Sequence, residues 1–169
     1  SCIIGEVWIP RNSNTPAVCK KIIQDFGPEG KNHKRLVRCY GDPTGGNGGT
    51  AKTEGSDWDL IEKYLRPVFG SRLRIEVDKK TPRERARVNA VNSRLRSANN
   101  TIRMVVNPND APHSVDDFEG VVVKEGSAGE LDKDSKKYKW LTHLSDGHGY
   151  YFKKKFTDDE SRKIKAIQY

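Results

Sequence analysis

The stretch RLVRCYGDPTGGNGG, Arg35–Gly49, joins a short apolar run to a loop rich in glycine. The run Leu36–Tyr40 predicts a strand, and Asp42 follows where that strand should end, in front of a flexible loop. A carboxylate at the end of a buried strand is a common way to hold a metal ion against a large substrate. Asp42-Pro43 also opens turns readily, so this segment alone leaves a metal ligand and a turn residue as alternatives.

Strand and helix patterns alternate on both sides of this stretch. Upstream, Cys2–Ile9 predicts a strand and Pro16–Phe26 an amphipathic helix capped by Thr15. Downstream, the patterns predict a helix that begins at a capping box of Ser56 and Asp59 and ends at Pro67 and Gly70, a strand over Arg72–Val77, a helix that begins at a capping box over Thr81–Glu84, and a strand over Thr101–Val106. This alternation argues for an α/β fold with parallel strand pairs. Sites in such sheets lie at the carboxyl ends of strands, where Asp42 is expected.

The C-terminal part of the sequence is less regular. Ser114–Val123 predicts a short helix running into a strand, and Val123–Leu141 a hairpin or mobile loop. Trp140–Phe156 predicts a helix, which Gly147 and Gly149 would weaken by roughly 1 kcal/mol each relative to alanine. That cost is easier to understand if something approaches the backbone closely there.

Length and charge bound the class of protein. The chain has 169 residues, with 31 Lys and Arg against 23 Asp and Glu, for a net charge of +8. Such an excess favours a polyanionic partner, most often nucleic acid, although a merely basic protein would share it. We expect one domain over residues 1–156 and a charged tail over 157–169. Three cysteines without paired spacing suggest reduced thiols in a cytosol, and no segment has the length and apolarity of a membrane span.

A second candidate site lies in the stretch THLSDG, Thr142–Gly147. On a helix, His143 and Asp146 are one turn apart and share a face, where they could bind a divalent metal and tune a proton transfer. A surface polar pair is the simpler alternative. Taken with Asp42 and the basic charge, two distant carboxylates could converge on Mg²⁺ or Mn²⁺. Two such ions would activate water and stabilise the leaving oxygen in phosphodiester cleavage.

Candidate phosphate-binding residues gather in the helix predicted after Thr81. Its faces other than the apolar one carry five arginines, namely Arg83, Arg85, Arg87, Arg94 and Arg96. Lys124, in the loop before the C-terminal helix, is a further candidate. A solvated face and a phosphate-contacting face are equally compatible with this pattern. Binding through such residues would be largely independent of DNA sequence and sensitive to salt.

Five segments, taken in order, resemble the nuclease (C-terminal) domain of the large terminase subunit of tailed bacteriophages. They are YGDPTGG (Tyr40–Gly46), SDWDLI (Ser56–Ile61), RVNAVNSRL (Arg87–Leu95), DFEGVVVKEG (Asp117–Gly126) and THLSDGHGYY (Thr142–Tyr151). The similarity covers nearly the whole chain, and THLSDGHGYY is its most telling piece.

This resemblance implies an RNase H-like fold, with a central mixed sheet flanked by helices, and a two-metal endonuclease that uses Mg²⁺ or Mn²⁺. The implied substrate is double-stranded DNA, cut at the start and end of genome packaging. The implied partners are the viral portal protein, the small terminase subunit and an ATPase domain of the same parent chain. The implied location of this protein is the host bacterial cytoplasm, and it is not expected to be a permanent component of the virion. Asp42 matches the second of the family's three acidic metal ligands. Asp146 matches the one on the C-terminal helix, and His143 the histidine before it.

The resemblance also implies that part of the family's site is missing from this sequence. The first acidic ligand of the family lies upstream of the segment that resembles Cys2–Pro10, and the ATPase signature G-x-x-x-x-G-K-[ST] does not occur. We therefore expect a C-terminal fragment of a larger motor. Glu6 and Asp78 could each be a further ligand, but neither matches a site residue of the family, and we expect them to be solvated or capping acids. Two other functions stay open: a non-catalytic basic module that holds DNA or docks on the portal, and another RNase H-like nuclease such as a junction resolvase.

Overall fold

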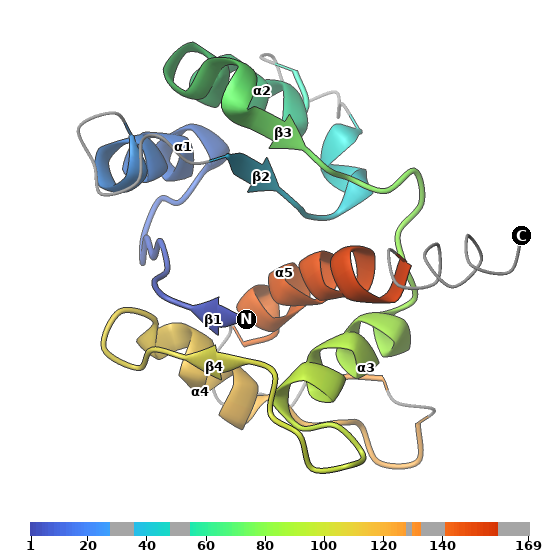
Figure 1. Ribbon diagram of the computed structural model, residues 1–169. Helices are drawn as coiled ribbons and strands as arrows, with labels where there is room; N and C mark the ends of the chain where they lie inside the picture. The colour runs from blue at the N-terminus through green and yellow to red at the C-terminus, as the bar shows by residue number, and fades with distance from the viewer. Residues whose placement is uncertain (28–35, 48–54, 128–129, 133–140, 159–169) are drawn as a thin grey trace, which may run out of the picture. The chain divides into compact units, whose positions relative to one another are not determined.

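A computed structural model describes the chain except for residues 28–35, 48–54, 128–129, 133–140 and 159–169 (Figure 1). Its contacts divide the chain into two compact units, Val7–Thr81 on the one hand and Ser1–Glu6 with the residues from Pro82 onward on the other. The predicted tail over 157–169 lies almost entirely outside the described residues. Among the helices that are described, none combines the length and apolarity needed to cross a membrane.

The unit Val7–Thr81 is a helix followed by a β–α–β arrangement. Its elements are α1 (Thr15–Phe26), β2 (Val37–Cys39), the 3-10 helix η1 (Pro43–Gly46), α2 (Asp57–Phe69), the 3-10 helix η2 (Gly70–Arg72) and β3 (Leu73–Ile75) (Figure 1). β2 and β3 pair in parallel, with Val37 opposite Leu73. Parallel strands need a crossover connection, which α2 supplies. The predicted parallel pairing is therefore confirmed here.

Both helices of this unit begin at capping residues. Asn14, instead of the predicted Thr15, caps α1 by accepting a hydrogen bond from the backbone N–H of Ala17. Ser56 and Asp59 form the predicted capping box of α2. The prediction that Pro67 helps to end α2 was wrong, because α2 continues through it to Phe69. The core between these helices and the strands consists of Cys19, Leu65, Phe69 and Leu73.

The second unit places three helices around a short parallel strand pair. Its elements are β1 (Cys2–Ile3), α3 (Glu84–Leu95), β4 (Val105–Val106), α4 (Pro112–Gly120), α5 (His143–Phe152) and the π-helix η3 (Lys153–Asp158) (Figure 1). β1 and β4 pair in parallel, with Cys2 opposite Val105. α5 packs against both α3 and α4. The core of this unit consists of Ala90, Val91, Met104 and Phe152.

Several predicted elements differ from those observed. The four strands predicted before residue 107 are each shortened to two or three residues, and the strand predicted at the end of Ser114–Val123 is reduced to a single bridge at Val123. The predicted capping box at Thr81–Glu84 was wrong, because α3 begins at Glu84 and its N-cap, Arg83, makes no side-chain capping hydrogen bond. The described residues form two separate two-stranded sheets, where a central mixed sheet was predicted. The predicted α/β class is confirmed, with helices and short parallel strand pairs.

The loop before α5 and α5 itself agree with their predictions in part. Val123 and Leu131 form an isolated antiparallel bridge, which is a short piece of the hairpin expected over Val123–Leu141. The helix predicted over Trp140–Phe156 begins at His143, and its last turns adopt the π-helical form. Trp140 lies outside the described residues.

Glu6, three residues after β1, contacts the start of α4. Its backbone N–H donates to the carbonyl oxygen of Asp110 at 3.1 Å, and its carboxylate accepts hydrogen bonds from the backbone N–H groups of His113 and Ser114 at 3.0 and 2.8 Å. These groups lie in the first turn of α4, where a negative charge is favoured. Burial raises the pKa of Glu6, but the hydrogen bonds from His113 and Ser114 outweigh it, so the pKa is lowered. Glu6 is thus a capping acid, as predicted.

Candidate functional site

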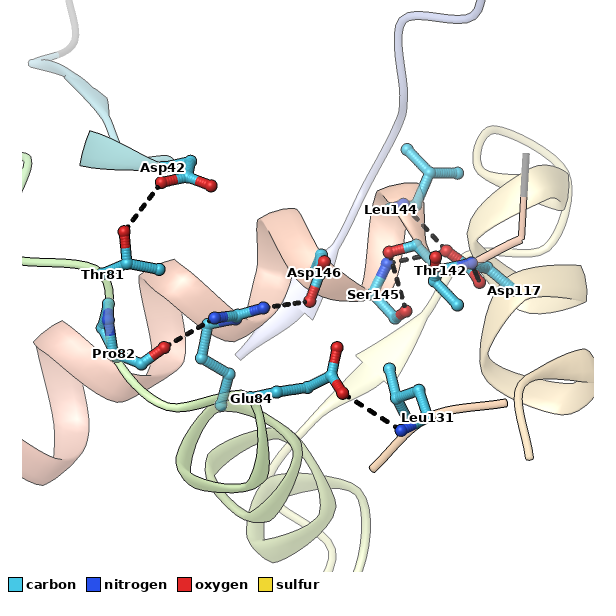
Figure 2. Close-up of polar contacts among 11 residues, drawn as sticks. Asp42, Thr81, Pro82, Glu84, Asp117, Leu131, Thr142, Leu144, Ser145 and Asp146 are labelled. Carbon is cyan, nitrogen blue, oxygen red and sulfur yellow. Dashed lines mark hydrogen bonds and ion pairs between the residues drawn. The ribbon is translucent and has the colours of Figure 1, made fainter. Parts of the chain in front are cut away.

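Asp42 lies at the carboxyl end of β2, three residues after the strand, and caps η1. Its Oδ1 accepts a hydrogen bond from the backbone N–H of Thr44 at 2.9 Å and from the hydroxyl of Thr81 at 3.1 Å (Figure 2). The turn interpretation of Asp42 is therefore confirmed. It does not compete with a ligand role, because the turn leaves the carboxylate at the end of a parallel strand, where α/β sheets bind ligands.

The first turn of α5 carries His143 and Asp146. His143 is the first helical residue and is exposed. Asp146 is partly buried, and its Oδ1 accepts a hydrogen bond from Nη2 of Arg87 at 2.8 Å. Its Oδ2 accepts no hydrogen bond from the described residues, among which none joins His143 to Asp146 either. The turn therefore presents a carboxylate with one oxygen paired and an exposed imidazole one turn away.

Asp117, on α4, anchors this turn of α5. Its side chain is fully buried and accepts hydrogen bonds from the backbone N–H groups of Thr142, Leu144 and Ser145 at 2.6, 2.8 and 2.7 Å (Figure 2). The first N–H groups of a helix lack partners within the helix, and their partial positive charge suits a carboxylate. Asp117 therefore fixes the backbone that carries Asp146. No motif in the sequence marked Asp117 for this role.

Arg87 is buried against α5 and does not lie on the solvated or phosphate-contacting face where it was predicted. It is 6% exposed, and its Nη1 donates to the carbonyl oxygen of Pro82 at 2.7 Å while Nη2 holds Asp146. Its guanidinium carbon lies 4.5 Å from the centroid of the Tyr150 ring. Its Nε is buried and has no hydrogen-bond partner among the described residues. Arg87 therefore orients Asp146 and is not placed to reach a phosphate.

The other predicted phosphate contacts lie nearer to solvent. Arg94 is half-buried, with its guanidinium carbon 3.9 Å from the centroid of the Phe156 ring. The rest are exposed in the same unit, namely Arg83, Arg85, Arg96 and Lys124. Their long side chains can pair with phosphates without losing a buried partner, which separates them from Arg87.

Gly147 and Gly149, the two glycines of α5, have different surroundings, although the same close approach was predicted for both. A Cβ added at Gly149 would lie 2.8 Å from Cβ of Arg87, whereas a Cβ at Gly147 would have no neighbour within 4 Å. The close approach predicted for this helix is confirmed at Gly149, where α5 meets α3. At Gly147 no such approach is found.

Alanine at these two positions should therefore change stability in opposite directions. Gly149→Ala should lower the free energy of unfolding by about 1 kcal/mol, because overpacking costs ~1–3 kcal/mol and the gain in helix propensity is at most ~1 kcal/mol. Gly147→Ala should raise it by up to about 1 kcal/mol, since only propensity changes. Urea unfolding of both variants tests this, and effects of equal sign would contradict the assigned packing.

The donors at the two acids suit a hard divalent cation. A pocket of about 100 Å³ borders Asp146; its other polar lining residues are Arg87, Asn92, Asp117 and Ser145, and the rest of its lining is apolar. Mg²⁺ binds through one or two carboxylates and keeps several water ligands, and Asp42 in the one unit and Asp146 in the other each offer a carboxylate of that kind. Within the described part of the chain, no three His, Cys, Asp or Glu side chains are grouped as a metal site. Comparison with models of protein families, with curated proteins and with solved structures gives no match.

Proposed function

We propose that this chain is a metal-dependent endonuclease domain of a viral DNA-packaging terminase, which cuts double-stranded DNA. The observation that carries the proposal is the place of Asp42, at the carboxyl end of a parallel strand and held by Thr44 and Thr81. Asp146, with one carboxylate oxygen free of hydrogen bonds from the described residues, supports it. The five-segment resemblance and the net charge of +8 point to the same substrate class.

In the proposed reaction, Asp42 and Asp146 bind Mg²⁺ or Mn²⁺. The bound ions would supply an activated water and charge stabilisation at the phosphate. His143, exposed in the first turn of α5, orients the attacking water. Asp117 accepts a hydrogen bond from the backbone N–H of Ser145, next to Asp146, and Arg87 donates one to the Asp146 carboxylate. Together these bonds hold Asp146 in place. The exposed cations bind the phosphates of the duplex, namely Arg83, Arg85, Arg96 and Lys124, with Arg94 beside them.

The fold family, the partners and the place of action are further parts of the same proposal. The parallel β–α–β unit and the helices around β1 and β4 are compatible with an RNase H-like fold, which we propose on the resemblance. The portal protein, the small terminase subunit and an ATPase domain of the parent chain are proposed as partners on the same basis. The host cytoplasm is the proposed place of action.

Titration with Mn²⁺ tests the proposal through the metal alone. Mn²⁺ is paramagnetic, so it broadens the amide NMR signals of residues near its site. We expect the signals of Thr44 and Gly45, beside Asp42, and of Ser145 and Gly147, beside Asp146, to broaden at sub-millimolar Mn²⁺. Asp42→Asn and Asp146→Asn should each weaken this broadening, because an amide is a poorer ligand for a hard cation than a carboxylate.

The same titration separates the nuclease from the binding module. Broadening of none of these signals at millimolar Mn²⁺ would sink the nuclease proposal. A basic domain that holds DNA or docks on the portal would then fit the charge better.

A further inference from the structure

Trp58, in the first turn of α2, is in contact with the turn that carries Asp42. Its Nε1–H donates a hydrogen bond to the backbone carbonyl oxygen of Asp42 at 2.9 Å. The indole also borders two glycines of that turn, because a Cβ added at Gly41 or at Gly45 would lie 3.0 Å from its ring atoms. One side chain therefore contacts the turn at three successive places, before, at and after the carboxylate.

Gly41 and Gly45 allow the indole of Trp58 to approach the turn closely, and neither adopts a backbone conformation that requires glycine. The positive-φ glycines of the described chain are Gly55, Gly70 and Gly126, and none of them is in this turn. Alanine could therefore adopt the backbone of Gly41 and Gly45, but its Cβ would lie 3.0 Å from the indole, close enough that the ring or the turn must shift by a few tenths of an ångström. The flexible loop expected after Asp42 is, over Pro43–Gly46, a 3-10 turn packed on a tryptophan.

Trp58 is itself fixed by the start of α2. Ser56 and Asp59 form the capping box on either side of it, and the side chain of Asp59 accepts a hydrogen bond from the backbone N–H of Ser56 at 2.9 Å. The hydrogen bonds from Ser56 lower the pKa of Asp59, which keeps it ionised for this role. The ring thus extends from a rigid helix start to the end of β2. Side chains of this kind hold a functional group in its productive geometry.

We propose that Trp58 is a positioning residue for Asp42. It holds the turn Gly41–Gly46 by one hydrogen bond and by contact with Gly41 and Gly45, so that the Asp42 carboxylate keeps the orientation in which it binds a cation. Trp58 touches neither DNA nor metal in this role. The inference rests on the proposed function, because it concerns the same carboxylate.

Three variants test the inference by Mn²⁺ binding, read from the broadening of the Thr44 amide signal. Trp58→Phe removes the indole N–H and keeps an aromatic ring, and Gly45→Ala adds a methyl group against the indole. Both should weaken Mn²⁺ binding at Asp42 by about 10- to 100-fold, the usual effect of losing a group that orients a metal ligand. Gly46→Ala is the matched control, because its Cβ would lie at an ordinary 3.6 Å from Trp58 and should leave the affinity unchanged.

A further control separates positioning from loss of stability. Val68→Ala trims a side chain that packs on the core of the same unit, away from the turn. It should lower the unfolding temperature and leave the Mn²⁺ affinity unchanged. If Trp58→Phe fails to fold, the comparison of Gly45→Ala with Gly46→Ala still decides.

The outcomes distinguish this inference from the proposed function. If the wild-type chain binds Mn²⁺ at Asp42 and both Trp58→Phe and Gly45→Ala bind it equally well, the positioning role is wrong and the nuclease proposal stands. If the wild-type chain shows no Mn²⁺ at Asp42, the proposed function fails and the positioning role fails with it. Weaker binding in Gly45→Ala with unchanged binding in Gly46→Ala supports the inference.

Discussion

Asp42→Asn and Asp146→Asn should each lower the rate of duplex DNA cleavage in Mn²⁺ by about 1,000-fold or more. Bound metal ions contribute several kcal/mol of transition-state stabilisation, and ~4 kcal/mol corresponds to about three powers of ten in rate. Asparagine keeps the shape of the side chain and can still accept the hydrogen bond from Thr44 that caps η1. The loss should therefore be one of charge, measured as the rate of plasmid nicking under single-turnover conditions.

Two aspartates provide matched controls for this prediction, one in each unit. Asp25 pairs on α1 with Lys21 at 2.8 Å, and Asp116 is exposed on α4. Asp25→Asn and Asp116→Asn change the net charge by the same amount and should cleave at the wild-type rate. If Asp42→Asn and Asp146→Asn both cleave at the wild-type rate, the assignment of these two acids to the site is wrong.

Asp117→Ala should lower the free energy of unfolding by about 3 kcal/mol, the largest stability loss we expect from a single substitution. The variant leaves the N–H groups of Thr142, Leu144 and Ser145 without their acceptor in a buried place. Each buried donor left unsatisfied costs roughly 1–3 kcal/mol, and part of this is recovered where water reaches the helix end. Urea unfolding followed by far-UV circular dichroism measures the change.

Asp116→Ala is the control for this substitution, because Asp116 is the exposed neighbour of Asp117 on α4. Its effect should stay within about 0.5 kcal/mol, as for surface substitutions in general. Asp117→Asn should fall between the two, since an amide oxygen accepts hydrogen bonds without the negative charge that a helix start favours. If Asp117→Ala were as stable as Asp116→Ala, the anchoring of α5 by α4 would be wrong.

Local patterns predicted the helices better than the strands. The apolar periodicity of α1 and the capping box of α2 are contained within a dozen residues, so the sequence carries them directly. A strand depends on its partner, and β4 offers β1 a partner of two residues. The apolar run Cys2–Ile9 therefore looks like a longer strand than it forms, because strand propensity reports packing more than backbone preference.

The candidate site was predictable where its signal is local. Asp42 stands at a boundary between a strand pattern and a turn pattern, and that boundary is where the structure places it. Asp117 and Arg87 carry no such signal. The backbone donors that Asp117 accepts from lie 25 to 28 positions away along the chain, and Asp146 lies 59 positions from Arg87. The helix α3 also shows little separation of apolar and polar faces that would mark Arg87 as buried. Gly149 was predictable in part. The sequence shows that a glycine in a helix costs stability, but it does not show that Arg87 is the residue that packs against it.

The order of the two units along the chain has a consequence for how the protein forms. Val7–Thr81 is one continuous segment, so every contact of that unit is available as soon as Thr81 has left the ribosome. The other unit is split, and Ser1–Glu6 must wait for β4 and α4 before it finds its partners. Contacts of such long sequence separation form late. We therefore expect Val7–Thr81 to acquire structure before the other unit during synthesis, and Ser1–Glu6 to join its unit only once β4 and α4 have been made.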